Sequence, residues 1–275
     1  MKILFFGDIM GRAGRDALAQ YLPVLTAQHK PDFVVANAEN AAAGYGLTLK
    51  IAADLFALGI DVLTTGNHVW DQKELLSTIQ NEPRILRPCN FPKDTPGSGH
   101  FIAQSKTGRK LLVVNVMGRL FMDAMDDPFA ATTEIINAHH LGKTVDGILI
   151  DVHCEASSEK QAIAHLFDGR VTAVLGSHTH VPTADDRILA NGTAFQTDTG
   201  MCGDYDSVIG MKKDLSVQRM TRKYSFERLT PAEGEGTVCA ALVESDDKTG
   251  LAKSISTYRL GGALKQTAGA LKQTA

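Results

Sequence analysis

The sequence predicts an α/β fold, a two-layered β-sheet sandwich flanked by helices. Short apolar runs typical of buried strands alternate with helical patterns up to Leu175, a rhythm typical of a mostly parallel sheet covered by helices on both faces. After Gly192 strand-like runs dominate, which indicates antiparallel pairing and a second layer. The 275 residues are 44% hydrophobic, enough to bury one large core within a single domain.

The parallel part is expected to place its strands where turn residues bound apolar runs, at residues 2–7, 32–38, 61–65, 111–116, 147–152 and 171–175. Helices are expected at residues 15–28, where leucines recur at helical spacing, and at residues 49–58, before Gly59. Asp71 is expected to cap a helix that ends near residue 80. Residues 158–161 (SEKQ) fit a capping box for another helix.

The second half is expected to add antiparallel strands at residues 193–197, 237–243 and 251–260. Two long segments, 88–101 and 119–131, are expected to be either binding loops or plain surface loops. Residues 1–260 form the single predicted domain. Residues 261–275 contain the sequence GALKQTA twice, and two short copies are too few for a repeat fold, so a flexible extension is expected.

Composition and charge exclude several classes of function. The formal net charge is −3 with both signs mixed along the chain, so bulk binding of nucleic acid is not expected. No window approaches the roughly 20 apolar residues that a membrane helix needs. The four cysteines form no C-x-x-C pair, and a core of this size needs no disulfides, so a reducing cytoplasm is the expected location.

Residues that commonly bind metals stand at the ends of five strand-like runs. They are Asp8, Glu39, Asn40, Asn67, His153, His178 and His180. Because the carboxyl ends of parallel strands meet at one crevice, these side chains are expected to lie together at one sheet edge. Carboxylate, amide and imidazole groups suit hard or borderline divalent cations. The sequence therefore predicts a metal site at this edge.

Two other interpretations of these residues are weaker. The turn at residues 11–14 could cradle a dinucleotide pyrophosphate, but it lacks the G-x-G-x-x-G spacing, and Asp8 would repel phosphate. The remaining histidines stand alone in the sequence and are expected to have no catalytic or metal-binding role. They are His29, His100, His139, His140 and His165.

The motifs resemble those of the calcineurin-like metallophosphoesterases, whose signature combines Gly-Asp, a second acidic motif, Gly-Asn-His, a lone His and Gly-His-x-His. Three departures are specific: Met10 replaces the usual His after Asp8, Glu39 replaces the bridging Asp, and Val69 follows Gly-Asn-His where an acid is usual. With these departures, residues 1–211 look like the YmdB-like branch, which contains bacterial cyclic-nucleotide phosphodiesterases.

The resemblance implies two metal ions, most readily iron or manganese, with zinc as an alternative. Metal one would take Asp8, Glu39, Asn40 and His180, and metal two would take Glu39, Asn67, His153 and His178. The amide of Asn40 would replace the ligand that is lost at Met10. His68, beside a ligand but not needed as one, would protonate the leaving group. The sequence leaves its carboxylate partner open among Asp71, Asp185 and Asp198.

The expected function is therefore hydrolysis of cyclic nucleotides at two metals by metal-activated water, and the resemblance implies 2′,3′-cyclic nucleotides first, with 3′,5′-cyclic ones as a further candidate. A phosphomonoesterase and a nucleotide-sensing regulator without turnover remain the alternatives. Phe91, Phe121 and Phe129 in the two long segments are candidate contacts for the base or ribose. The resemblance also implies a homo-oligomer, and no membrane partner is expected.

Overall fold

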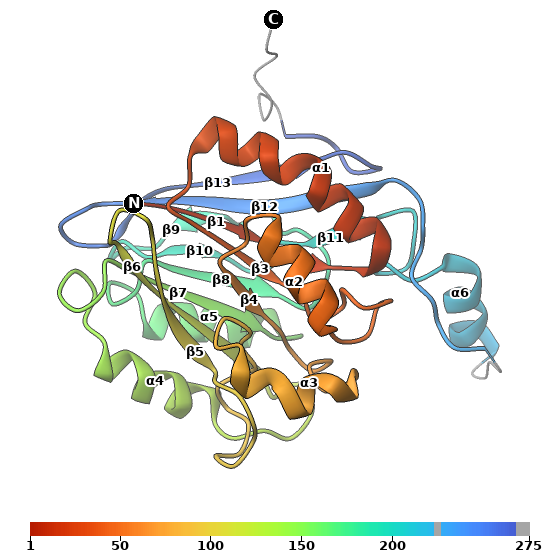
Figure 1. The fold of residues 1–275 in the computed structure, drawn as a ribbon, viewed down its shortest axis with the longest axis horizontal. Coiled ribbons are helices and arrows are strands. Elements are labelled where there is room, and N and C mark those ends of the chain that lie inside the picture. The colour runs from red at the N-terminus through yellow and green to blue at the C-terminus, as the bar shows by residue number, and fades with distance from the viewer. Residues whose placement is uncertain (223–226, 268–275) are drawn as a thin grey trace, which may run out of the picture.

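The structure is a computed structural model that describes residues 1–222 and 227–267. Two β-sheets pack face to face, and helices cover the outer side of each (Figure 1). The prediction of a two-layered sandwich flanked by helices is confirmed. Among the described residues no helix is long and apolar enough to cross a membrane.

The first sheet has the strand order β2-β11-β12-β1-β3-β4, with β13 paired to β12. Its strands are β1 (Lys2–Phe6), β2 (Asp8–Ile9), β3 (Phe33–Asn37), β4 (Val62–Thr64), β11 (Met201–Asp204), β12 (Gly236–Ser245) and β13 (Ala252–Leu260). β1, β3 and β4 run parallel, as expected from the alternation of strands and helices. β12 lies antiparallel to β1 and β13, as expected for the second half.

The second sheet has the order β5-β6-β7-β8-β10-β9. Its strands are β5 (His100–Gln104), β6 (Lys110–Met117), β7 (Gly147–His153), β8 (Ala173–Ser177), β9 (Arg187–Ile188) and β10 (Ala194–Gln196). The antiparallel assignment expected for residues 193–197 is wrong with respect to β8, because β10 pairs parallel with β8 and antiparallel only with β9. A three-residue strand carries too little pattern to reveal its direction.

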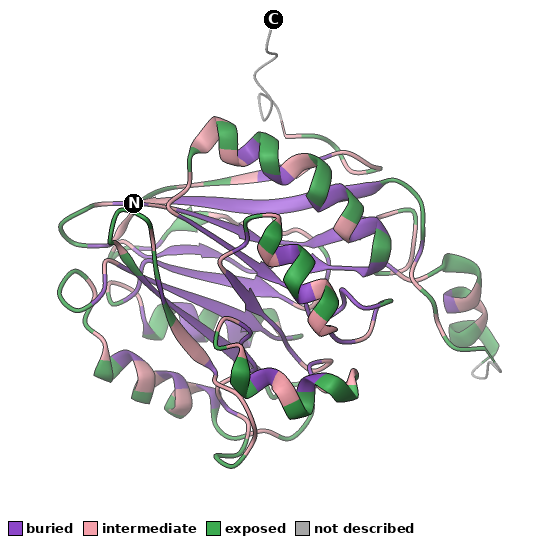
Figure 2. Ribbon diagram, viewed as in Figure 1, coloured by how far each residue is buried: buried purple, intermediate pink, exposed green. Residues whose placement is uncertain are grey.

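The central strands of the first sheet alternate between two cores. Ile3 and Phe5 of β1 face the second sheet, where they join a core with Leu149 and Leu175, while Leu4 and Phe6 face the helices. Because both faces are covered, β1 is an almost unbroken apolar run. The strands are buried throughout the centre, whereas the outer faces of the helices are exposed (Figure 2).

The helices are α1 (Gly11–His29), α2 (Leu49–Ala57), α3 (Lys73–Thr78), η1 (Ile79–Asn81), α4 (Pro128–Ala138), α5 (Ser157–Leu166) and α6 (Lys213–Arg222). α1 and α2 pack on the first sheet, and α4 and α5 pack on the second. α6 stands apart from both sheets at the right of Figure 1.

Two predicted helix caps are wrong. α3 begins after Gln72, and Asp71 makes no cap bond because its carboxylate contacts His68 instead. α5 begins at Ser157, one residue before the predicted capping box, and its N-cap Ala156 has no side-chain bond. The carboxylate of Glu159 accepts bonds from the backbone N–H groups that follow β6, so tertiary contacts override the local motif.

The two unassigned segments are largely irregular, but each contains the start of an element. β5 includes Phe101, and α4 begins at Pro128, capped by Asp127. Near the C-terminal end of the described residues, Thr267 makes two hydrogen bonds with Arg259 of β13. The second GALKQTA copy lies outside the described residues, so the extended tail stays a prediction.

Candidate metal centre

The predicted ligands come from the carboxyl ends of both sheets, not from one sheet edge as expected. Glu39 and Asn40 follow β3, and Asn67 follows β4 in the first sheet. His153 ends β7, and His178 follows β8 in the second sheet. The carboxyl ends of β3 and β4 meet those of β7 and β8 where the two sheets pack face to face. The site therefore lies at the join between the sheets.

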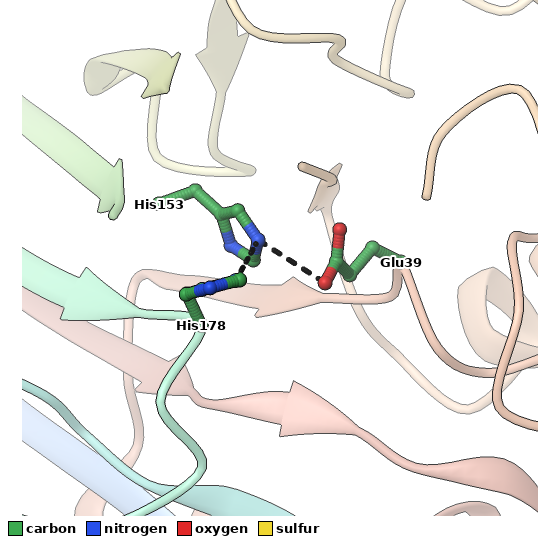
Figure 3. A group of neighbouring side chains, drawn as sticks. All are labelled: Glu39, His153 and His178. Atoms are coloured by element: carbon green, nitrogen blue, oxygen red, sulfur yellow. Dashed lines mark hydrogen bonds and ion pairs between the residues drawn. The ribbon is translucent and has the colours of Figure 1, made fainter. Parts of the chain in front are cut away.

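The imidazole Nε2 of His153 is the centre of the tightest group of ligand atoms. It lies 3.1 Å from Glu39 Oε1, 3.0 Å from Asn67 Oδ1 and 3.0 Å from His178 Nδ1. Figure 3 shows Glu39, His153 and His178 converging from three different strands. The His153 side chain is fully buried.

A metal cation fits this group of atoms better than protons do. One proton on His153 Nε2 can be donated to only one of the three atoms that face it. The other lone pairs would then point at each other without a donor. A cation among the four atoms would bind all of them, and imidazole, carboxylate and amide oxygen are accepted ligands of iron, manganese and zinc.

The charges in this group are strongly coupled. Burial alone would raise the pKa of the Glu39 carboxyl, but His153 lowers it to about 2. Burial would lower the pKa of His153, but Glu39 raises it to about 9. Burial and the neighbouring His153 together lower the pKa of His178 to about 3. These directions favour an anionic Glu39 and a neutral His178, the states required of metal ligands, whereas His153 would have to release a proton when a cation binds.

A second group of ligand atoms lies beside the first. His180 Nε2 is 3.3 Å from Asn40 Oδ1 and 3.9 Å from Asp8 Oδ1. His180 Nδ1 donates to the carbonyl of Ile209 (2.8 Å), which leaves Nε2 to present a lone pair. Asn40 Nδ2 donates to Gly44, so its oxygen faces His180.

Backbone geometry at the site is unusual in ways that aim the ligands. His178 and His180 both have a positive φ, 95° and 65°, a backbone conformation that residues other than glycine rarely adopt. Gly66 lies against the His153 ring and Glu39 Oε2, and a Cβ at this position would collide with both. Glycine therefore lets the loop after β4 approach the metal ligands closely.

His68 lies at the edge of this site. Its backbone N–H donates to Glu39 Oε2 (3.1 Å), and its Nδ1 lies 2.8 Å from Asp71 Oδ2. Of the three candidate carboxylate partners, Asp71 makes this contact, whereas Asp185 bonds Thr183 and Thr197, and Asp198 bonds Lys160. The His68 side chain is 31% exposed, so its ring is partly open to solvent.

Comparisons with known proteins agree with this fold. A sequence model of the YmdB-like protein family matches residues 4–258. The chain belongs to the YmdB-like protein family. A relative named 2′,3′-cyclic-nucleotide 2′-phosphodiesterase, from Bacillus subtilis (strain 168), is 45% identical over 249 residues, 90% of this chain and 93% of its own length.

Two solved structures share the fold of this chain. A hypothetical protein from Thermus thermophilus is 39% identical, with a TM-score of 0.88 over 96% of this chain and 100% of its own. A structure described as a novel phosphatase, from Mycoplasma pneumoniae, is 32% identical, with a TM-score of 0.87 over 95% of this chain and 93% of its own. The recognition of the family from its motifs is confirmed.

Several buried polar contacts beside the candidate site were not expected from the sequence. Lys160 of α5 is fully buried, and its Nζ donates to Asp198 and to the carbonyl of Ser177, both at 2.7 Å. Asp198 also accepts from the N–H and hydroxyl of Thr179, between the two histidine ligands. A lysine in a polar helix gives no sequence signal of this burial.

The candidate base contacts and the other histidines lie in different places. Phe91 packs edge-on against Trp70, and Phe129 packs against the outer core, whereas Phe121 is 91% exposed. Of the three, Phe121 alone presents its ring to solvent. None of the five histidines expected to be uninvolved belongs to the described ligand groups.

Proposed function

We propose that this chain is a binuclear metal-dependent phosphodiesterase that hydrolyses cyclic nucleotides. The observation that supports this most is the convergence of Glu39, Asn67 and His178 on His153 Nε2, with the His68–Asp71 pair beside it. The names of the relatives, phosphodiesterase and phosphatase, confirm the expected enzyme class, a phosphoric ester hydrolase.

The proposed ligand sets follow the two groups of atoms. Glu39, Asn67, His153 and His178 would hold one metal, and Asp8, Asn40 and His180 would hold the other together with Glu39. Bound there, the two ions would activate water for attack and neutralise charge on the phosphate. Iron or manganese is proposed from the mixed nitrogen and oxygen ligands, which zinc also accepts.

His68 is proposed as the general acid. Asp71 bonds its Nδ1, which orients the ring and stabilises the charge that the imidazole carries when Nε2 holds a proton. The backbone bond from His68 to Glu39 keeps the imidazole close to the metal ligands. Nε2 can therefore protonate an alkoxide that leaves the phosphorus.

The choice of substrate follows the relative from Bacillus subtilis. Its name specifies 2′,3′-cyclic nucleotides and cleavage at the 2′ position, and 90% of this chain aligns with it. We propose the same ring for this chain, with 3′,5′-cyclic nucleotides as secondary substrates. The exposed Phe121 is proposed as a base contact. A cytoplasmic location is proposed as well, since all four cysteines are free thiols.

The test is a substrate screen on protein reconstituted with Mn²⁺ or Fe²⁺. We expect turnover of 2′,3′-cyclic nucleotides to the 3′-monophosphate, faster than that of 3′,5′-cyclic nucleotides and p-nitrophenyl phosphate. A wide preference for the monoester would favour the phosphomonoesterase. Saturable nucleotide binding without product would favour the sensor. Light scattering on the same sample checks the predicted homo-oligomer.

A further inference from the structure

A group of fully buried polar side chains lies between the sheets beneath the proposed metals. Asn37 of β3, Thr64 of β4, Asp151 of β7 and Ser177 of β8 each come from a different strand, and none is exposed to solvent. Burying a carboxylate is costly unless hydrogen bonds compensate for the lost water. The bonds that Asp151 receives therefore indicate what this group is arranged to do.

Three neutral donors surround the Asp151 carboxylate. Its Oδ1 accepts from Ser177 Oγ at 2.6 Å, and its Oδ2 accepts from Asn37 Nδ2 at 3.1 Å and from the hydroxyl of Thr64. Ser177 Oγ also lies 2.9 Å from His153 Nδ1. One carboxylate is thus connected to a proposed metal ligand through a single hydroxyl.

The direction of these bonds follows from the number of protons. A carboxylate only accepts, so the single hydroxyl proton of Ser177 goes to Asp151. Ser177 Oγ must then accept from His153 Nδ1. This assignment places a proton on Nδ1, and His153 presents the lone pair of Nε2 to Glu39, Asn67 and His178. Partners on the second nitrogen of a metal-binding histidine fix its tautomer and ring orientation in this way.

A second arm from the same carboxylate reaches the turn after β3. Asn37 donates to Asp151 through Nδ2, and its Oδ1 accepts from the backbone N–H of Glu39 at 3.1 Å. Asn37 Nδ2 also lies 3.2 Å from the carbonyl of Thr65, two residues before Asn67. The buried group therefore connects the segments that carry three ligands of one metal.

We propose that Asp151 and Ser177 are positioning residues for the second metal, the one held by Glu39, Asn67, His153 and His178. Asp151 acts through Ser177 to fix the Nδ1–H tautomer of His153, and through Asn37 to hold the turn that carries Glu39. This inference rests on the metal centre in the proposed function. It adds a polar network that neither the sequence motifs nor the ligand set includes.

The experiment compares three variants by metal titration and by NMR. Ser177→Ala removes the acceptor of His153 Nδ1, and Ser177→Cys keeps a side chain of the same shape whose larger sulfur is only a weak acceptor. Thr64→Val is the matched control, because it removes another hydroxyl from the same carboxylate without touching His153. Mn²⁺ affinities are measured for both sites, and the tautomer of His153 is read from ¹⁵N shifts of the Zn²⁺-loaded protein.

We expect Ser177→Ala to weaken Mn²⁺ binding at the site that contains His153 by about 10- to 100-fold. The Mn²⁺ affinity of the other site should stay close to that of the unchanged protein. The Mn²⁺ affinity of Ser177→Cys at the His153 site should lie between those of Ser177→Ala and the unchanged protein. This variant replaces Ser177→Ala in the test if the alanine variant does not fold. Thr64→Val should retain both sites. In the unchanged protein, the His153 signal should show a protonated Nδ1 and a metal-bound Nε2.

Three results would overturn the inference. If Ser177→Ala and the unchanged protein bound Mn²⁺ with equal affinity, Ser177 would not position His153. A proton on Nε2 of His153 would have the same meaning. If Thr64→Val lost as much Mn²⁺ affinity as Ser177→Ala, the effect would come from any hydrogen bond to Asp151 and not from the one through Ser177 to His153. Binding of fewer than two ions by the unchanged protein would instead overturn the proposed function, and this inference with it.

Discussion

Glu39 joins the two groups of ligand atoms. Its Oε1 faces His153, its Oε2 accepts from the backbone of His68, and the neighbouring Asn40 faces His180. We predict that Glu39→Gln lowers metal content and removes most activity, because a neutral amide bridges two cations poorly. Metal analysis and turnover of a 2′,3′-cyclic nucleotide check this.

Glu155→Gln is the matched control for the loss of one negative charge. The Glu155 carboxylate lies 3.3 Å from His178 Nε2, but it is half exposed and is not among the proposed ligands. This variant should keep two metals per chain. If Glu39→Gln also kept two metals and near-normal turnover, Glu39 would not bridge them.

Asn40 is the proposed ligand that would compensate for Met10. Its oxygen lies 3.3 Å from His180 Nε2, oriented by the bond from its amide to Gly44. We predict that Asn40→Ala weakens the metal that Asp8 and His180 hold and leaves the other in place. Titration that resolves the two sites checks this. Equal loss of both metals, or of neither, would contradict the compensation.

The His68–Asp71 pair should matter most for poor leaving groups. We predict that His68→Ala lowers turnover of cyclic nucleotides by about 10²–10⁴-fold, because their alkoxide leaves badly without a proton. An activated p-nitrophenyl diester should lose much less, and metal content should not change. Asp71→Asn should show the same dependence on the leaving group with a smaller loss.

Two results would assign another role to His68. Equal losses on both substrates with full metal occupancy would make it a phosphate-binding residue. Loss of metal would make it a ligand. The geometry argues against a ligand role, since the His68 backbone N–H, not its ring, contacts Glu39.

At the scale of elements, the central strands could be predicted because strands buried on both faces consist of apolar residues. β1, β3 and β7 are buried on both faces and appear as apolar runs, and the proposed ligands Asp8, Glu39 and His153 lie at or within two residues of their ends. Short strands such as β9 and β10 carry too few residues for a pattern, and only their neighbours decide their direction.

The supporting polar residues could not be predicted for a different reason. Lys160, Asp151 and Ser177 are of types usually found at the surface, and only the packing of the two sheets places them inside. The sequence likewise offered three carboxylates for His68. The turn after β4 brings Asp71 to it, at the expense of the helix cap that local sequence favoured.

The buried Lys160–Asp198 pair connects α5 to the loop that carries His178 and His180. Burial would raise the pKa of Asp198, but the Lys160 ammonium lowers it below its usual value. We predict that Asp198→Asn lowers the free energy of unfolding by about 3–5 kcal/mol at neutral pH, because the lysine remains buried without its partner. Urea unfolding from pH 7 to pH 2.5 checks this.

The pH dependence has a definite sign. A carboxyl whose pKa is lower in the folded state stabilises the fold above its unfolded pKa of about 3.9. That contribution disappears as the pH falls through the folded pKa, so the difference between Asp198→Asn and the unchanged protein should shrink in acid. Asp54→Asn, which breaks the exposed pair with Lys50, should change stability little. A difference that did not vary with pH would contradict the assignment.

At the scale of the whole molecule, the site depends on the packing of one sheet on the other. The proposed ligands of one metal lie at the ends of β3 and β4 in one sheet and of β7 and β8 in the other, and the core between the sheets fixes their separation. Every described strand and helix lies between Lys2 and Leu260. The domain prediction of residues 1–260 therefore leads to a direct test.

We predict that a chain ending at Thr267 keeps the stability and metal content of the full chain. Thr267 is retained because it hydrogen-bonds Arg259, which holds the return of residues 261–267 onto β13. Substitutions and losses outside packed elements usually change stability by no more than about 0.5 kcal/mol, so the melting temperature should move by no more than about 2 °C. A chain ending at Leu260 is the comparison, because it loses the bonds to Arg259 and should melt lower. If the chain ending at Thr267 lost metal or melted well below the full chain, residues 268–275 would belong to the domain.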